Sequence, residues 1–254
     1  MKLRKLYLVA LCAVVVTASV PALSFAAESI TAQAPTDSST HYEAKDTTGG
    51  TIDVTVETTG EATIVTKTAD SSSMCSYTTD SADSTDITLE KISTTDKKVT
   101  IPSAIKGGNG TTYTVKTIGD GAFKNAKVEK VAFPSTVKTV EENAFAGSAL
   151  KNVNTKNTDT IGAGAFKDCK KMTKATTSAT KVGAGAFKNS GLKKLTYKNT
   201  SGNTEFAKGA FGGMKKGTKV VVKTTSKAQF NSIKSDIEKA GGKKLNITFK
   251  KVKK

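Results

Sequence analysis

Apolar residues recur along the second half of the chain at a nearly constant interval. Five short phrases join a glycine or asparagine, an alanine and a phenylalanine, and an apolar residue stands five positions before each phenylalanine. The phenylalanines are 22, 21, 21 and 24 residues apart. Such a period indicates a solenoid, in which each unit buries its apolar side only by stacking on the next. The five residues are Phe123, Phe145, Phe166, Phe187 and Phe211.

A second apolar pattern begins about five residues after each phenylalanine and predicts one short strand per unit. The alternation is clearest from Val128 to Phe133 and from Leu192 to Tyr197. A strand of three or four residues cannot bury its apolar side alone, so stacked units must align their phenylalanines in one column. Burial of each ring contributes about 2 kcal/mol to this core. The pattern therefore predicts a β-rich solenoid.

Both ends of the array carry segments that differ from the repeated unit. Residues 99–102 and 111–115 flank a glycine-rich turn whose Asn-Gly pair favours a tight hairpin. We therefore expect an N-terminal β-hairpin cap. At the other end Ser226 and Gln229 form a capping box, which opens a helix with an apolar stripe. Apolar alternation over residues 245–249 then predicts a closing strand, which completes a C-terminal helix-strand cap.

One unit carries a specific family pattern. From Val128 through Pro134 to Phe145 the chain resembles the BspA-like family of bacterial surface leucine-rich repeats, whose unit runs roughly L-x-x-L-x-L-P-x-x-L-x-x-I-x-x-x-A-F-x-x-C. The resemblance extends from Val99 to the C-terminus and implies a leucine-rich repeat array of about five 21–24-residue units. Cys169 falls at the family's cysteine position, which favours a packed thiol. Residues 172–177 form a weak strand pattern, so we expect a looser middle of the array.

The first 98 residues differ in character from the repeat. Three basic residues, an apolar run and the small residues Ser24 and Ala26 are typical of a secretory signal peptide, so we expect no membrane span after its removal. Alternation from Ile52 to Val56 predicts strands in the region that follows. We therefore expect a signal peptide over residues 1–26, a flexible leader over 27–48, a small β-rich module over 49–98 and the repeat domain over 99–254.

The charge is unevenly distributed. The chain has a formal net charge of +17, from 39 Lys+Arg and 22 Asp+Glu. Residues 27–100 hold five Lys and thirteen acids, whereas residues 101–254 hold 31 Lys and nine acids. The only arginine is Arg4, and nucleic-acid readers rely on arginine for bidentate contacts. The lysines therefore predict diffuse attraction to polyanions, and the lack of arginine outside the signal peptide excludes nucleic acid as a partner. The alternative is a solvated lysine coat that only maintains solubility.

Residues that could support catalysis are few and scattered. His41 is the single histidine, and it has no neighbouring nucleophile in the sequence. Glu141 and Glu142 are adjacent and point apart on an extended turn. Cys75 and Cys169 have no spacing typical of a disulfide framework or a metal site, so we expect two thiols. We expect no enzyme and no catalytic, cofactor-binding or metal site; a hydrolase would need a catalytic group in the N-terminal module.

The outward residues of the predicted strands form candidate partner-binding strips, because corresponding positions of stacked strands align. Repeat surfaces of this kind usually recognise partners on the strand face. Lysine, asparagine and threonine suit an anionic glycan, an anionic wall polymer or an acidic protein surface. The first strip is Lys130, Asn152, Lys174 and Lys194, and the second is Ala132, Asn154, Thr176 and Thr196.

These observations favour a non-catalytic, secreted or cell-surface protein. The resemblance implies adhesion or interaction with a host or bacterial surface protein or an anionic glycan. The alternative is an envelope-associated structural protein that anionic wall polymers retain electrostatically. A salt series separates the two, because weak exposed charge contacts are screened by moderate salt.

Overall fold

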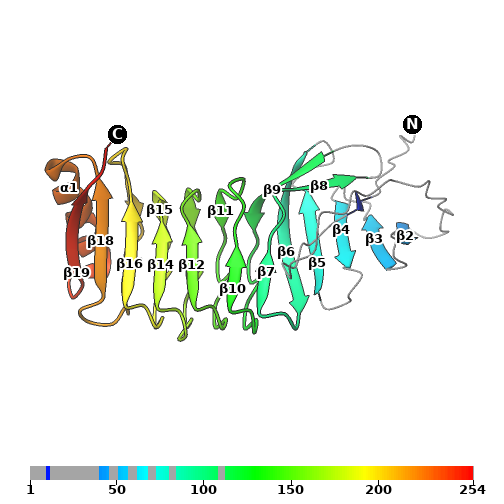
Figure 1. Cartoon of the computed structure of the whole chain (residues 1–254), viewed down its shortest axis with the longest axis horizontal. Coiled ribbons are helices and arrows are strands. Elements are labelled where there is room, and N and C mark those ends of the chain that lie inside the picture. The colour runs from blue at the N-terminus through cyan, green and yellow to red at the C-terminus, as the bar shows by residue number, and fades with distance from the viewer. Residues whose placement is uncertain are drawn as a thin grey trace.

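The computed structural model describes residues 10–11, 40–45, 51–56, 62–67, 73–79, 84–107 and 112–253. In this part of the chain short strands stack side by side along one long axis, and a helix lies at the C-terminal end (Figure 1). The strands form two sheets, and the predicted β-solenoid of leucine-rich repeats is confirmed.

The first sheet has seven strands, and every pair of neighbours is parallel. Each strand begins with Lys or Asn, and in all of them except the last, buried residues alternate with exposed or half-buried ones, so the sheet has one solvent face and one core face. In spatial order the strands are β7 (Lys98–Thr100), β10 (Lys130–Ala132), β12 (Asn152–Thr155), β14 (Lys174–Thr177), β16 (Lys194–Lys198), β18 (Lys219–Thr224) and β19 (Asn246–Lys251).

The second sheet has twelve strands. Its parallel part runs through β9 (Thr112–Ile118), β11 (Thr139–Val140), β13 (Thr160–Ile161), β15 (Lys181–Val182) and β17 (Glu205–Phe206). Its antiparallel part comprises β6 (Asp86–Thr94), β5 (Ser73–Thr79), β4 (Ala62–Lys67), β3 (Thr51–Val56) and β2 (Thr40–Lys45). The remaining strands are β8 (Ala104–Gly107), which pairs with β9, and β1 (Ala10–Leu11), which pairs with β8.

Strand β6 joins the N-terminal strands to the repeats. It pairs antiparallel with β5 and parallel with β9, so one sheet continues from the first part into the second. Within the region predicted as a flexible leader, residues 27–48, strand β2 pairs with β3 along its whole length. The division of the chain into leader, module and repeat domain stays a prediction. Apart from β1, the predicted signal peptide lies outside the described residues and stays a prediction.

The five recurring phenylalanines form the predicted column. Their rings stack nearly parallel inside the solenoid, and interplanar angles do not exceed 18°. Successive centroids are 4.6, 5.3, 5.6 and 6.5 Å apart, which is the range of favourable aromatic contacts. Each ring is at most 2% exposed, so the column forms the axis of the core.

The turn around each phenylalanine needs two residues with positive φ. Two positions before the ring this residue is Gly or Asn, and two positions after it the residue is Asn, Asp or Gly. These types tolerate the left-handed region at little cost. Backbone amides of each turn donate to carbonyls of the next, as from Phe145 N–H to Ala165 O at 2.8 Å. The recurring Gly-Ala-Phe phrase therefore serves both the column and a hydrogen-bonded ladder of turns.

The N-terminal hairpin has a different first arm from the predicted one. Residues 99–102 do not pair with 111–115; instead β7 starts the seven-stranded sheet, and β8 is the antiparallel partner of β9. Pro102 has no backbone N–H and ends the ladder after Ile101, which allows the chain to cross to the other sheet. The predicted glycine-rich turn lies mostly outside the described residues.

The C-terminal helix begins as the capping box predicts. In α1 (Lys227–Ile237) the Ser226 hydroxyl accepts the Gln229 backbone N–H at 3.2 Å. A π-helical turn, η1 (Glu238–Gly242), follows, and the backbone leaves the helical conformation at Gly241, where φ is 99°. The helix packs on the last two strands of the seven-stranded sheet. Its buried residues are Phe230, Ile233 and Ile237.

The middle of the array forms despite its weak sequence pattern. Strand β14 pairs in register with β12 and β16, and Ala175 and Thr177 are buried on its core face. Hydrogen bonds to two flanking strands therefore compensate for small side chains, and the expectation of a looser middle finds no support in the strand pairing.

Tyr197 provides a test of this core at alkaline pH. Burial raises the pKa of Tyr197 to about 12, although the Asn199 side-chain amide donates to its oxygen at 3.0 Å. An unfolded tyrosine ionises near pH 10 (about 10 in model peptides), so the unfolded chain loses this proton first. The contribution of this proton to the free energy of unfolding is therefore fully present below about pH 10 and is lost between about pH 10 and 12.

Between about pH 9.5 and 11.5 we expect the free energy of unfolding, measured by urea denaturation, to fall less in the Tyr197→Phe variant than in the native chain. Parallel pH profiles for the two chains would contradict the assigned burial.

Candidate functional site

The solvent face of the seven-stranded sheet aligns the predicted strips. Lys130 lies opposite Asn152, Asn152 opposite Lys174, and Lys174 opposite Lys194. In the second strip Asn154 lies opposite Thr176, and Thr176 opposite Thr196; Ala132 belongs to the same register on β10. The structure therefore brings all eight predicted residues together on one face.

Both strips extend beyond the predicted residues. The first row continues to Lys98 on one side and to Lys219 and Asn246 on the other; the middle row continues to Thr100, Val221 and Thr248. A third row, which the prediction missed, consists of Lys198, Lys223 and Lys250 on adjacent strands. The alternation in 219–224 and 246–251 could have revealed these positions, because both segments repeat the spacing of the earlier strands.

These rows carry positive charge that the described chain does not neutralise. Every residue of the first row is exposed. The ion pairs between described residues involve other lysines, namely Lys151, Lys181, Lys234 and Lys239. The strand face is therefore a field of unpaired ammonium groups that threonine and asparagine separate.

The corresponding face of the twelve-stranded sheet is chemically different. Its aligned outward row begins with Thr117, Thr139 and Thr160. It ends with Lys181 opposite Glu205, and their charged groups are 3.1 Å apart. Here the chain supplies its own counter-charge, so the two faces of the solenoid differ in net charge.

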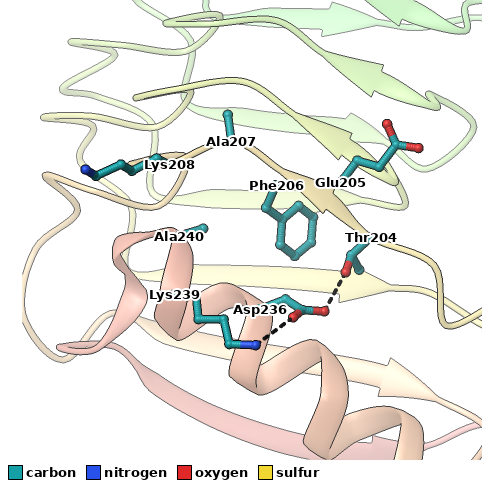
Figure 2. Close-up of a pocket in the computed structure, with 8 residues that line it drawn as sticks. All are labelled: Thr204, Glu205, Phe206, Ala207, Lys208, Asp236, Lys239 and Ala240. Carbon is teal, nitrogen blue, oxygen red and sulfur yellow. Dashed lines mark hydrogen bonds and ion pairs between the residues drawn. The ribbon is translucent and has the colours of Figure 1, made fainter.

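A pocket lies between β17 and the C-terminal helix (Figure 2). Phe206 stands at its centre, and its ring contacts Phe211 edge-on at 5.0 Å. The two acids of the pocket already have partners: Asp236 accepts from Thr204 at 2.7 Å and lies 3.9 Å from Lys239, while Glu205 pairs with Lys181. Because both carboxylates are engaged, we assign no acid–base chemistry to this pocket.

The other candidate groups have structural roles. Cys169 is fully buried; its thiol donates to the Phe145 carbonyl at 2.9 Å and lies 3.4 Å from the Ser148 hydroxyl. Burial raises the pKa of the Cys169 thiol, which opposes nucleophilic reactivity. The Glu141 carboxylate accepts the backbone N–H of Asp120 at 3.0 Å. The side chain of His41 lies outside the described residues.

Among the described residues, no three His, Cys, Asp or Glu side chains form a group that could hold a metal ion. In the same residues no helix has the length and apolar character that a membrane crossing requires.

Parallel strands, a repeat of about 21 residues and a stacked apolar column define a leucine-rich repeat solenoid. Residues 110–218 match the model of the BspA type leucine rich repeat region in six copies. The matched residues are therefore a region of BspA type leucine rich repeats, and the sixth copy adds one unit to the five that the phenylalanines indicate. No curated protein matches the chain. Repeats of this type are typical of surface and extracellular proteins that act through interactions.

Proposed function

We propose that this protein is a non-catalytic, secreted or cell-surface binding protein whose strand face recognises a macromolecular partner. The observation that carries the proposal is the register of the seven-stranded sheet, which aligns exposed lysines over most of its strands. The family match supports an interaction role, and the predicted signal peptide supports export. The partner class is a surface protein or an anionic glycan.

A charge-reversal series tests this proposal. We expect Lys130→Glu, Lys174→Glu and Lys194→Glu together to abolish binding to cells or to immobilised surface molecules, measured as retained protein at physiological salt. The matched control reverses Lys124, Lys167 and Lys188, which occupy equivalent positions of the phenylalanine turns and change the net charge equally. Equal loss in both variants, or unchanged binding in the strand-face variant, would refute the strand face as the binding site.

The alternative is an envelope-associated structural protein retained by anionic wall polymers. The excess of lysine in residues 101–254 favours it. In that case moderate salt alone should release the protein from native cells, and both reversal variants should be released with similar ease. Binding that is saturable and survives physiological salt would favour the first proposal instead.

A further inference from the structure

The C-terminal half of the strand face concentrates charge in two parallel rows, which we call the lysine rails. The first rail is Lys174, Lys194 and Lys219 on β14, β16 and β18. The second rail is Lys198, Lys223 and Lys250 on β16, β18 and β19. In each rail the lysines stand directly opposite one another on neighbouring parallel strands.

The geometry of the rails is fixed by the sheet. Neighbouring strands are about 4.8 Å apart, so each rail repeats one positive charge at this interval along the solenoid axis. Lys194 and Lys198 are four residues apart on β16, which separates the rails by about 13 Å. Between the rails lie Thr196, Val221 and Thr248, which are half-buried and uncharged. The surface between the two rows of lysines is therefore neutral.

The adjacent positive charges of the lysine rails are not neutralised by the described chain. Like charges directly opposite on neighbouring strands destabilise a sheet. On the twelve-stranded sheet the corresponding Lys181 faces Glu205 and is neutralised at 3.1 Å. In contrast to Lys181 on the other sheet, no rail lysine forms an ion pair with any described residue. The missing counter-charge must come from solvent ions or from a partner.

We propose that the partner of the lysine rails is a linear acidic polysaccharide with a carboxylate on each sugar, lying along the solenoid axis. The strand interval is close to the length of one sugar residue in an extended glycan, so successive carboxylates can meet successive lysines. Threonine hydroxyls between the rails can bond sugar hydroxyls. A flat lysine surface without aromatic anchors is poorly suited to a protein hot spot.

This inference rests on the proposed function, because it names the partner of the same face. It also separates a linear glycan from polyol phosphates, whose repeating unit is longer than the strand interval. Lysine suits this role because its compact ammonium acts as a point charge and needs no planar partner.

Titration calorimetry with polygalacturonate fragments of defined length tests the proposal on the full-length mature chain. We expect Lys194→Gln, Lys219→Gln and Lys223→Gln together to weaken binding at least about tenfold and to reduce the salt dependence of the affinity. The control Lys124→Gln, Lys167→Gln and Lys188→Gln has the same net charge, and we expect it to change the affinity less than about twofold. Circular dichroism and thermal unfolding verify that both variants fold.

Fragment length gives a second readout. Affinity should rise with each sugar until the fragment spans the four strands of the rails and then level off. An equal effect of both triple variants, equal binding of a neutral glycan, or stronger binding of polyphosphate would overturn the inference. If polygalacturonate does not bind but a surface protein binds in a manner sensitive to Lys130, Lys174 and Lys194, the glycan inference fails and the proposed function stands.

Discussion

Replacing Phe166 with alanine is expected to lower the free energy of unfolding by about 3–5 kcal/mol. The ring is fully buried at the centre of the column. It stacks on Phe145 at 5.3 Å and on Phe187 at 5.6 Å, so its removal deletes two ring contacts and leaves a cavity between coils. The neighbouring backbones cannot close this cavity, because the ladder of turn hydrogen bonds fixes the distance between coils.

The position of Phe166 also predicts how the protein unfolds. Each coil of a solenoid contacts only its neighbours, so a weak interface can separate the array into two cooperative parts. Urea denaturation followed by circular dichroism should therefore show a broader or two-step transition. The control is Phe133→Ala, whose ring is half-buried and touches the column only through a tilted contact with Phe145 at 5.6 Å. A loss at Phe166 no greater than that at Phe133 would contradict the column as the main source of stability.

Replacing Gly191 with alanine is expected to cost about 3 kcal/mol through overpacking against the backbone. A Cβ at this position would lie 2.0 Å from the Lys170 carbonyl oxygen, a backbone atom that cannot rotate away. The crowding has a cause in the sequence. Four residues separate Phe145 from Leu150 and Phe187 from Leu192, whereas five separate Phe166 from Met172. The extra residue is absorbed in a tight turn, in which Lys170 N–H donates to Asp168 O at 2.7 Å.

Two variants test this explanation by thermal and urea unfolding. Ala149→Gly changes the equivalent position of an unexpanded coil and should cost only about 0.5–1 kcal/mol. Deletion of Lys171 restores the four-residue spacing, so the deletion combined with Gly191→Ala should be more stable than Gly191→Ala alone. If the deletion brings no recovery, the bulge at Lys170 is not the reason that this position requires glycine.

The repeated half of the molecule was predictable because its information is local and recurs. The spacing of Phe123, Phe145 and Phe166 fixed the register of the coils, and the same register correctly aligned Lys174 with Lys194. The extension of the strips to Lys219 was missed because residues 219–224 were not predicted as a strand and residues 245–249 were interpreted only as a closing cap strand. Their lysines become part of the face only when β18 and β19 are known to continue the sheet.

The N-terminal half was less predictable because its strands depend on distant partners. In β5 the core-facing positions are Cys75, Tyr77 and Thr79, a mixture that has no clear apolar alternation. The strand Thr40–Lys45 is polar, and it forms by pairing with β3 rather than through its own propensity. Long-range pairing of this kind leaves no periodic trace in the sequence, whereas stacked identical units do.

The direction of the interstrand hydrogen bonds has a mechanical consequence. In both sheets of the repeat domain these bonds run along the long axis, from one coil to the next. A force that pulls the two ends apart along this axis therefore loads all coil boundaries equally in series, and the weakest boundary opens first. Each rupture releases about 21 residues of chain, or roughly 70 Å when extended, while the remaining coils stay folded. We therefore expect the repeat domain to lengthen in steps under tension and to refold by restacking its coils when the tension is released.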